Sequence, residues 1–159
     1  MKDMEREKIV AALKEISRRY DEVIALYLYG SYAHGSLRLH SDIDVGVLFA
    51  LSVPDTLKAS FRLETEIDEA LGAHKTEVAN LNGGSLRLRA EVLTTGIRVF
   101  SRNEDQRVDF EFNTIREWWD EQPWHAVYDR EYFATLKDNF TDEQWRAYQR
   151  ARQTLAISS

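Results

Sequence analysis

Residues 30–47 read GSYAHGSLRLHSDIDVGV, and this stretch decides the fold. Before it stands a continuous apolar run, residues 23–29, which is short, rich in β-branched and aromatic side chains, and typical of a buried central strand. At its end, residues 42–49 alternate between apolar and polar side chains, which indicates a second strand. One face of that strand carries Ile43, Val45 and Val47, and the other carries Asp42, Asp44 and Gly46. The sequence therefore predicts two strands joined by a polar loop that contains glycine.

Further helices and strands are predicted around this pair. Apolar residues at helical spacing predict helices over residues 9–20, 54–71 and 85–95. The second of these has an apolar stripe of Leu57, Phe61, Ile67 and Leu71. Short runs rich in β-branched residues predict strands over residues 76–81 and 97–100. We therefore expect an α/β (α+β) fold in which a mixed β-sheet is flanked by helices.

The character of the chain changes after residue 102. We expect a core domain over residues 1–102 and a helical, aromatic-rich extension over residues 103–159, within the same compact unit. The extension's aromatic residues include Trp118, Trp119, Trp124, Tyr128, Tyr132 and Phe133. Such side chains fill a local core or form the centre of a partner interface, and the residues alone leave both open. Residues 141–144, Thr-Asp-Glu-Gln, fit a capping box before a last helix.

Composition narrows the class of protein. The chain has 159 residues, of which 43% are hydrophobic and 30% charged, with a net charge of −6 and no cysteine. Disulfides and thiolate metal sites are excluded, and a cytoplasmic location is expected. The longest nearly apolar run is too short to span a bilayer, so we expect no membrane contact. Without a basic excess, direct binding to nucleic acid is not expected.

The chemistry is predicted at the two strand ends that flank the loop. Asp42 and Asp44 point to the same side of a strand, roughly 6.6–6.8 Å apart along the chain. Two carboxylates so placed suit divalent cations that clamp a transferring phosphoryl group. At Gly30-Ser31 the turn frees backbone N–H groups and adds a hydroxyl, both of which can hold phosphate oxygens. Either motif alone is more often a solvated strand edge or an ordinary turn, but their combination favours a phosphoryl-transfer site.

These motifs resemble those of the nucleotidyltransferase superfamily typified by DNA polymerase beta. More narrowly, GSYAHG followed by SDID resembles the minimal nucleotidyltransferases, the MNT antitoxins encoded beside HEPN ribonuclease toxins. The resemblance implies the nucleotidyltransferase fold, with Gly30 and Ser31 on the triphosphate of ATP. It also implies that Asp42 and Asp44 ligate two Mg²⁺ ions. Ser41 is expected to cap or orient these carboxylates and is grouped with the ATP-binding residues.

Three positions depart from the family's pattern. Glu77 stands where the family has a third acidic residue, and we expect it to complete the catalytic and metal-binding set despite its additional methylene. At Asn80 the family often has a second Asp. His34 replaces the usual arginine, so bidentate contact with phosphate is lost there. The remaining histidines, His40, His74 and His125, are expected singly in loops or at the surface rather than on a metal.

The resemblance further implies a Mg²⁺-dependent protein adenylyltransferase. It would transfer AMP from ATP to a tyrosine hydroxyl of a cognate HEPN toxin and so neutralise that toxin, within a hetero-oligomer of the two proteins. Two alternatives stay open. One is an antitoxin with weak catalysis that acts by binding and occlusion. The other is a nucleotidyltransferase for a small hydroxylated substrate such as an aminoglycoside, although the chain after Phe100 is short for the extra domain that such a substrate needs.

Overall fold

The computed structural model describes residues 2–34, 41–72, 74–121, 141–144 and 146. In chain order the elements are α1 (Lys2–Arg19), β1 (Val23–Tyr29), α2 (Ser31–His34), β2 (Ile43–Phe49), α3 (Thr56–Leu71), β3 (Thr76–Asn80), α4 (Leu86–Thr95), β4 (Ile97–Ser101) and α5 (Glu104–Asp120). Every helix and strand expected within residues 9–100 is present; α1 begins seven residues earlier than expected, and the other ends shift by at most two residues.

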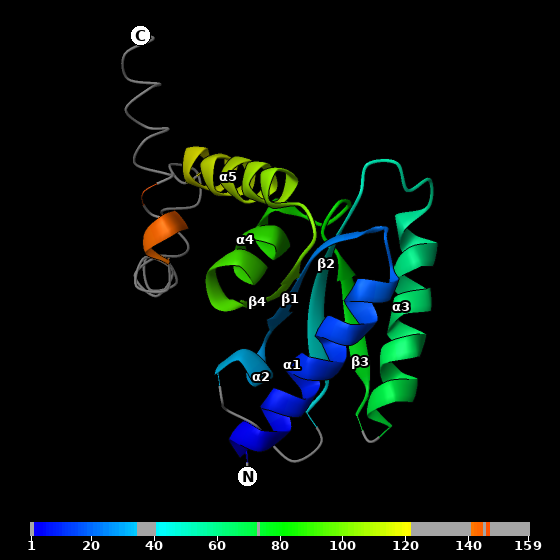
Figure 1. The fold of residues 1–159 in the computed structure, drawn as a ribbon. Coiled ribbons are helices and arrows are strands. Elements are labelled where there is room, and N and C mark those ends of the chain that lie inside the picture. The colour runs from blue at the N-terminus through cyan, green and yellow to red at the C-terminus, as the bar shows by residue number, and fades with distance from the viewer. Residues whose placement is uncertain (1, 35–40, 73, 122–140, 145, 147–159) are drawn as a thin grey trace, which may run out of the picture.

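The four strands form one mixed sheet in the order β3-β2-β1-β4. β1 lies at the centre and runs antiparallel to both β2 and β4, whereas β2 and β3 are parallel. Helices α1 and α3 cover one face, and α4 and α5 cover the other (Figure 1). The predicted α/β (α+β) class with a mixed, helix-flanked sheet is therefore confirmed.

The apolar run of β1 is continuous because both faces of the sheet are covered. Leu26 and Leu28 belong to the core beneath α1 and α3, while Ala25 and Tyr27 belong to the core beneath α4 and α5. All four are buried. A central strand with two buried faces needs apolar residues at every position, which is why the alternation seen in β2 is missing here.

Two expectations about local structure were wrong. The loop predicted between the first two strands contains the one-turn helix α2. In α3, Leu57 and Phe61 of the predicted stripe are 61% and 60% exposed, whereas Ile67 is buried together with Leu63, and Leu71 is partly buried, as predicted for Ile67 and Leu71. Each residue advances a helix by about 100°, so Leu57 and Phe61 lie on a different side of α3 from the buried Leu63 and Ile67.

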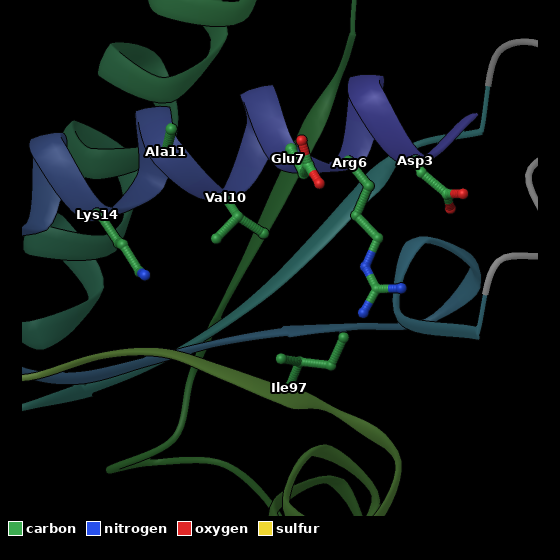
Figure 2. Close-up of a pocket in the computed structure, with 7 residues that line it drawn as sticks. All are labelled: Asp3, Arg6, Glu7, Val10, Ala11, Lys14 and Ile97. Carbon is green, nitrogen blue, oxygen red and sulfur yellow. The ribbon is translucent and has the colours of Figure 1, made fainter. Parts of the chain in front are cut away.

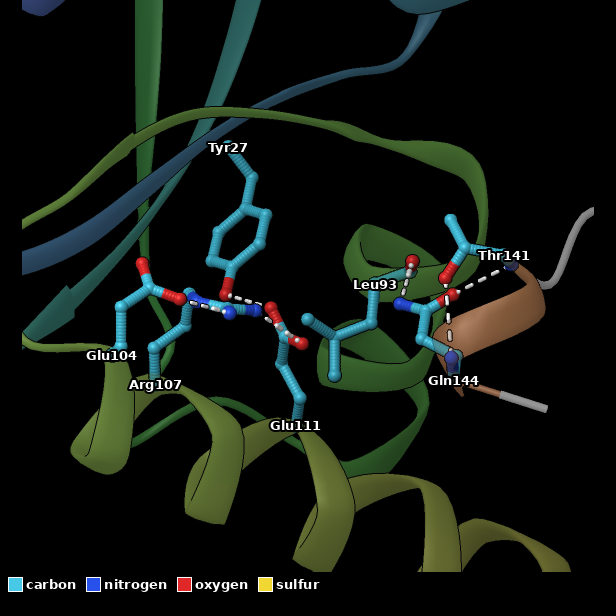
Figure 3. A network of polar contacts seen from close by, with 7 residues as sticks. All are labelled: Tyr27, Leu93, Glu104, Arg107, Glu111, Thr141 and Gln144. Atoms are coloured by element: carbon cyan, nitrogen blue, oxygen red, sulfur yellow. Dashed lines mark hydrogen bonds and ion pairs between the residues drawn. The ribbon is translucent and has the colours of Figure 1, made fainter. Parts of the chain in front are cut away.

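A polar network fastens α5 to the centre of the sheet (Figure 3). The Arg107 side chain is only 3% exposed and pairs with Glu104 at 2.5 Å and Glu111 at 2.8 Å. The Tyr27 hydroxyl of β1 donates to the Glu111 carboxylate at 2.7 Å. Burial, together with Glu111, raises the pKa of Tyr27, so the phenol stays a donor. Nothing in the hydrophobic pattern predicted this buried arginine.

Parts of the C-terminal region are described as well. Trp118 is buried beside α4 and Trp119 is half-buried, so for these two the core interpretation holds. The capping box is confirmed, because Thr141 and Gln144 exchange hydrogen bonds of 3.0 and 3.2 Å between side chain and backbone (Figure 3). The other aromatic residues of the extension, Trp124, Tyr128, Tyr132 and Phe133, lie outside the described residues, and the division at residue 102 stays a prediction.

Within the described ranges, no helix is both long and apolar enough to cross a bilayer.

Candidate active site

The register of three strands places the predicted acidic residues in one row. Asp44 of β2 is paired with Tyr29 of β1 on one side and with Glu77 of β3 on the other. Paired residues on neighbouring strands point to the same face, about 4.8 Å apart in the direction of the hydrogen bonds. Asp42 precedes Asp44 by two residues and adds a third carboxylate. Asp42, Asp44 and Glu77 therefore come together where β2 and β3 begin.

Gly30 lies directly against Asp44. Its φ of +69° is left-handed, a conformation that favours glycine. A Cβ at this position would overlap Oδ2 of Asp44 and would lie 3.1 Å from its Cγ. Both the backbone angle and the close approach thus require glycine at the end of β1. The glycine that the sequence singled out for phosphate contact also makes room for one of the proposed metal ligands.

The row is electrostatically strained in the absence of a cation. Burial raises the pKa of Asp44, and the nearby carboxylates of Glu77, Asp42 and Glu91 raise it further. Beside it, Tyr29 is half-buried, and burial together with the carboxylates of Asp44, Glu77 and Glu91 raises its pKa to about 12. Asp42 and Glu77 are exposed. Each charged group that shifts Asp44 is itself an anion, so a bound cation would relieve the repulsion.

Helix α3 holds the strand that carries Glu77. β3 is an edge strand, and its outward N–H groups at Thr76 and Val78 donate to the α3 side chains of Asp68, at 2.7 Å, and Glu64, at 3.1 Å. These two bonds flank Glu77 in the chain, so its backbone is anchored on both sides. They also satisfy an edge that would otherwise be open to pairing with another chain.

The site also contains residues that the sequence analysis did not select. Tyr29 could have been suspected, since it precedes Gly30 and falls on the same strand face as Tyr27. Glu91 belongs to α4, and only the packing of that helix over the sheet brings it near Asp44. Ser31 is the first residue of α2, and Ser41 directly precedes Asp42. The side chain of His34 lies outside the described residues.

His74, which was expected in a loop or at the surface, has two side-chain partners. It lies in the turn between α3 and β3, as predicted, but its side chain is only 18% exposed. Its Nδ1 is 3.0 Å from the Tyr32 hydroxyl of α2, and its Nε2 is 3.1 Å from Glu5 of α1. The isolated position of this histidine in the sequence carried no signal for these contacts.

The acidic residues are chemically suited to Mg²⁺. This cation prefers oxygen ligands and is commonly held by one or two carboxylates together with the phosphates of a substrate. Asp42 and Asp44 supply such oxygens, and their mutual repulsion favours a cation. Among the described residues, no three ligating side chains are already gathered closely enough to hold an ion by themselves. A divalent cation at these carboxylates would need further ligands, such as the phosphate oxygens of a substrate.

A cavity of about 540 Å³ lies away from this row, between α1 and the first residue of β4 (Figure 2). From α1, Arg6 extends toward Ile97, and Val10 and Lys14 project to the same side. None of Asp42, Asp44 and Glu77 lines it. The cavity is therefore distinct from the candidate active site.

Comparisons with known proteins show the family of this chain. The family described as polymerase beta, nucleotidyltransferase matches residues 11–105. A relative from Shewanella oneidensis, the protein adenylyltransferase MntA, is 29% identical over 117 residues, which cover 72% of this chain and 78% of that protein.

Two solved structures are similar in fold. One, a toxin–antitoxin complex with AMP-PNP, has a TM-score of 0.59 at 25% identity and covers 77% of this chain and 93% of its own. The other is a tri-AMPylated Shewanella oneidensis HEPN toxin in complex with an MNT antitoxin. Its TM-score is 0.54 at 24% identity, with 80% of this chain and 94% of that chain covered, which shows a shared fold.

Proposed function

Because this chain belongs to the polymerase beta nucleotidyltransferase family, we propose that it transfers AMP from ATP to a tyrosine hydroxyl of a cognate HEPN ribonuclease toxin. The observation that carries the proposal is the row formed by Asp44 and Glu77, with Asp42 beside it and Gly30 packed against the Asp44 carboxylate. The three carboxylates can ligate a divalent cation, and the Gly30 backbone beside them can contact a phosphate group. The protein then acts as an antitoxin, in the cytoplasm where ATP is available.

Each site residue has a role in this proposal. Gly30 and Ser31 hold the triphosphate of ATP through backbone N–H groups and the serine hydroxyl. Asp42, Asp44 and Glu77 hold two Mg²⁺ ions, and Ser41 orients Asp42. When bound, Mg²⁺ supplies charge neutralisation at phosphorus and a lower pKa for the attacking hydroxyl.

The reaction is an in-line substitution at the α-phosphate of ATP. The tyrosine oxygen forms the new O–P bond, and the bond between the α-phosphate and pyrophosphate breaks. The tyrosine proton passes to the carboxylate of Asp44 or Glu77, which are the two paired residues of the row. AMP remains on the acceptor as a phosphodiester, and pyrophosphate leaves.

A protein acceptor fits this chain better than a small molecule. The relative in Shewanella oneidensis is a protein adenylyltransferase, and the similar solved structures are complexes with toxins. After β4 the described chain continues as α5, whose Arg107 and Trp118 are buried against the core rather than forming a separate substrate domain. AMP on a toxin adds bulk and negative charge, which would repel RNA.

The test is incubation with ATP, Mg²⁺ and the cognate HEPN protein, followed by intact-mass measurement. We expect the HEPN protein to gain one or more AMP units, and none with the double variant Asp42→Ala, Asp44→Ala. Circular dichroism of that variant should match the wild type, since Asp42 is exposed and Asp44 is only partly buried. An unchanged mass with wild-type protein would refute the proposed transfer.

Occlusion without catalysis is the second candidate. One observation favours it: at Asn80, where the family often has an acidic residue, the amide donates to Thr56 at 2.6 Å and accepts from the backbone of residue 82. That side chain is therefore engaged in holding α3 rather than free for a ligand. Nucleotide dependence separates the two candidates, because occlusion protects RNA from the toxin equally well with and without ATP.

A further inference from the structure

A chain of polar contacts joins three segments beside the proposed phosphate site. Tyr32, the second residue of α2, is 2% exposed, and its hydroxyl is 3.0 Å from Nδ1 of His74. The two rings meet edge to face, with centroids 5.8 Å apart. On its other side, Nε2 of His74 lies 3.1 Å from a carboxylate oxygen of Glu5. Helix α2 is thus linked to α1 through the turn that leads into β3 (Figure 1).

The direction of these hydrogen bonds follows from their partners. Burial and the carboxylates of Glu5 and Asp42 raise the pKa of Tyr32, so its hydroxyl is protonated and can donate to Nδ1 of His74. In the tautomer that accepts this bond, the hydrogen on Nε2 points to the Glu5 carboxylate, which can only accept. The Tyr32 hydroxyl, both ring nitrogens of His74 and the Glu5 carboxylate each have a hydrogen-bond partner, so the three side chains fix one another's orientation.

The position of Gly30 and Ser31 depends on the contacts among Tyr32, His74 and Glu5. Helix α2 has four residues, too few to be stable by its own hydrogen bonds. Tyr32 anchors it by packing into the core beneath α1 and α3 and by its bond to His74. Ser31 directly precedes that anchor, and Gly30 must stay within contact of Asp44. A shift of Tyr32 would therefore move the backbone that faces the carboxylate row.

We propose that Tyr32, His74 and Glu5 are positioning residues that hold the Gly30-Ser31 backbone in place for the triphosphate of ATP. The identity of the ligand, ATP, rests on the proposed function, whereas the contacts that hold α2 in place do not. It assigns a role to a histidine and a glutamate that are far from the glycine-serine motif in sequence and touch no predicted catalytic residue. It also explains why the residue after Ser31 is a buried tyrosine with its hydroxyl engaged.

The first measurement is hydrogen exchange of the ATP-free protein, read on a peptide that covers residues 28–34. Tyr32→Phe keeps the ring and removes the hydroxyl, and His74→Ala removes the acceptor. Both should exchange faster in this peptide than the wild type. Tyr20→Phe is the matched control, because the Tyr20 hydroxyl also makes one side-chain hydrogen bond, to the carboxylate of Glu66 on α3, but at the opposite end of α1. It should leave this peptide unchanged.

The second measurement is the dissociation constant of ATP with Mg²⁺, obtained by equilibrium binding. Loss of one hydrogen bond should weaken ATP binding roughly three- to tenfold in Tyr32→Phe and in His74→Ala. The double variant should be no weaker than the worse single variant, since both changes break the same chain. Tyr20→Phe should stay within about twofold of wild type. In the transfer assay, the loss should appear in KM for ATP rather than in kcat.

Unchanged exchange in the 28–34 peptide of Tyr32→Phe and His74→Ala would overturn the inference, as would ATP affinities equal to that of Tyr20→Phe. Additive losses in the double variant would also overturn it, because they would mean that the two residues act separately. A wild-type protein that binds ATP but transfers no AMP would refute the proposed function alone. The exchange and binding measurements would still decide the positioning role.

Discussion

Gly30→Ala is the substitution that most directly tests the proposed site. Alanine adds one methyl group, in a place where it would overlap Oδ2 of Asp44 and lie 3.1 Å from Cγ. The carboxylate is the end of a rotatable side chain, so it can turn away, and a displacement of about 1 Å is enough to relieve the overlap. Misplacement of a reacting group by this amount costs about a hundredfold in rate. We therefore expect AMP transfer to fall about a hundredfold.

The effect of Gly30→Ala on stability should be much smaller. A left-handed φ costs an alanine about 1–2 kcal/mol relative to glycine. Gly72 is the matched control, because its φ is also positive, at +55°, and nothing lies within 4 Å of where its Cβ would be. Urea unfolding should therefore show both variants destabilised by a similar 1–2 kcal/mol, roughly the cost of the left-handed backbone alone.

The assay compares the two alanine variants in parallel, with AMP transfer followed by the mass of the acceptor and stability followed by urea unfolding. Gly72→Ala should keep nearly full activity, since the added methyl group would meet no atom within 4 Å. If Gly30→Ala transfers AMP as fast as Gly72→Ala, the Asp44 carboxylate does not need its present position, and the assignment of this row as the active site is wrong.

Three further predictions concern the carboxylate row and the packing around it. Asp44→Asn should abolish AMP transfer but raise the melting temperature measured in EDTA at pH 7. Because the pKa of Asp44 is raised on folding, stability is lost as the pH rises through that raised pKa, and asparagine removes this loss; a lower melting temperature at pH 7 would contradict it. Glu111→Ala should lower the free energy of unfolding by about 3 kcal/mol, because Arg107 is buried, whereas Glu104→Ala, which removes its exposed partner, should cost less than about 1 kcal/mol. Asn82→Ala should cost about 1–3 kcal/mol in urea unfolding, since its amide bonds both backbone groups at the end of β2 at 2.8 Å each, and a neutral result would mean that water replaces these bonds.

Much of the fold could be predicted because its helices and strands depend on patterns of residues that are close together in the sequence. The period of two in residues 43–47 predicted which face of β2 carries Asp44, and the capping box at Thr141 predicted the start of a late helix. The apolar stripe of α3 was predicted correctly at Ile67 and Leu71 but not at Leu57 and Phe61. Phe61 and Ile67 both fit a helical period, and only the packing of α3 on the sheet shows that Phe61 points to solvent.

For the candidate site, the residue types and their spacing came from the sequence, but their arrangement in space did not. GS and DxD lie close together in the chain, and alternation along one strand places Asp42 and Asp44 on the same side. Glu77 was matched by resemblance, and the parallel pairing of β2 with β3 places it beside Asp44. Its role in holding metal stays a prediction.

The sequence by itself determined the local elements, the mixed-sheet class and the residues that belong to the phosphoryl-transfer motif, because all of these depend on neighbours within a few positions. Only the tertiary structure decided that Glu91 faces Asp44, that Gly30 must lack a side chain beside a carboxylate, and that His74 links Tyr32 to Glu5. These contacts join residues that are 14 to 69 positions apart. They depend on strand register and on how helices pack over the sheet, which the hydrophobic pattern leaves undetermined because many polar residues could occupy the same place.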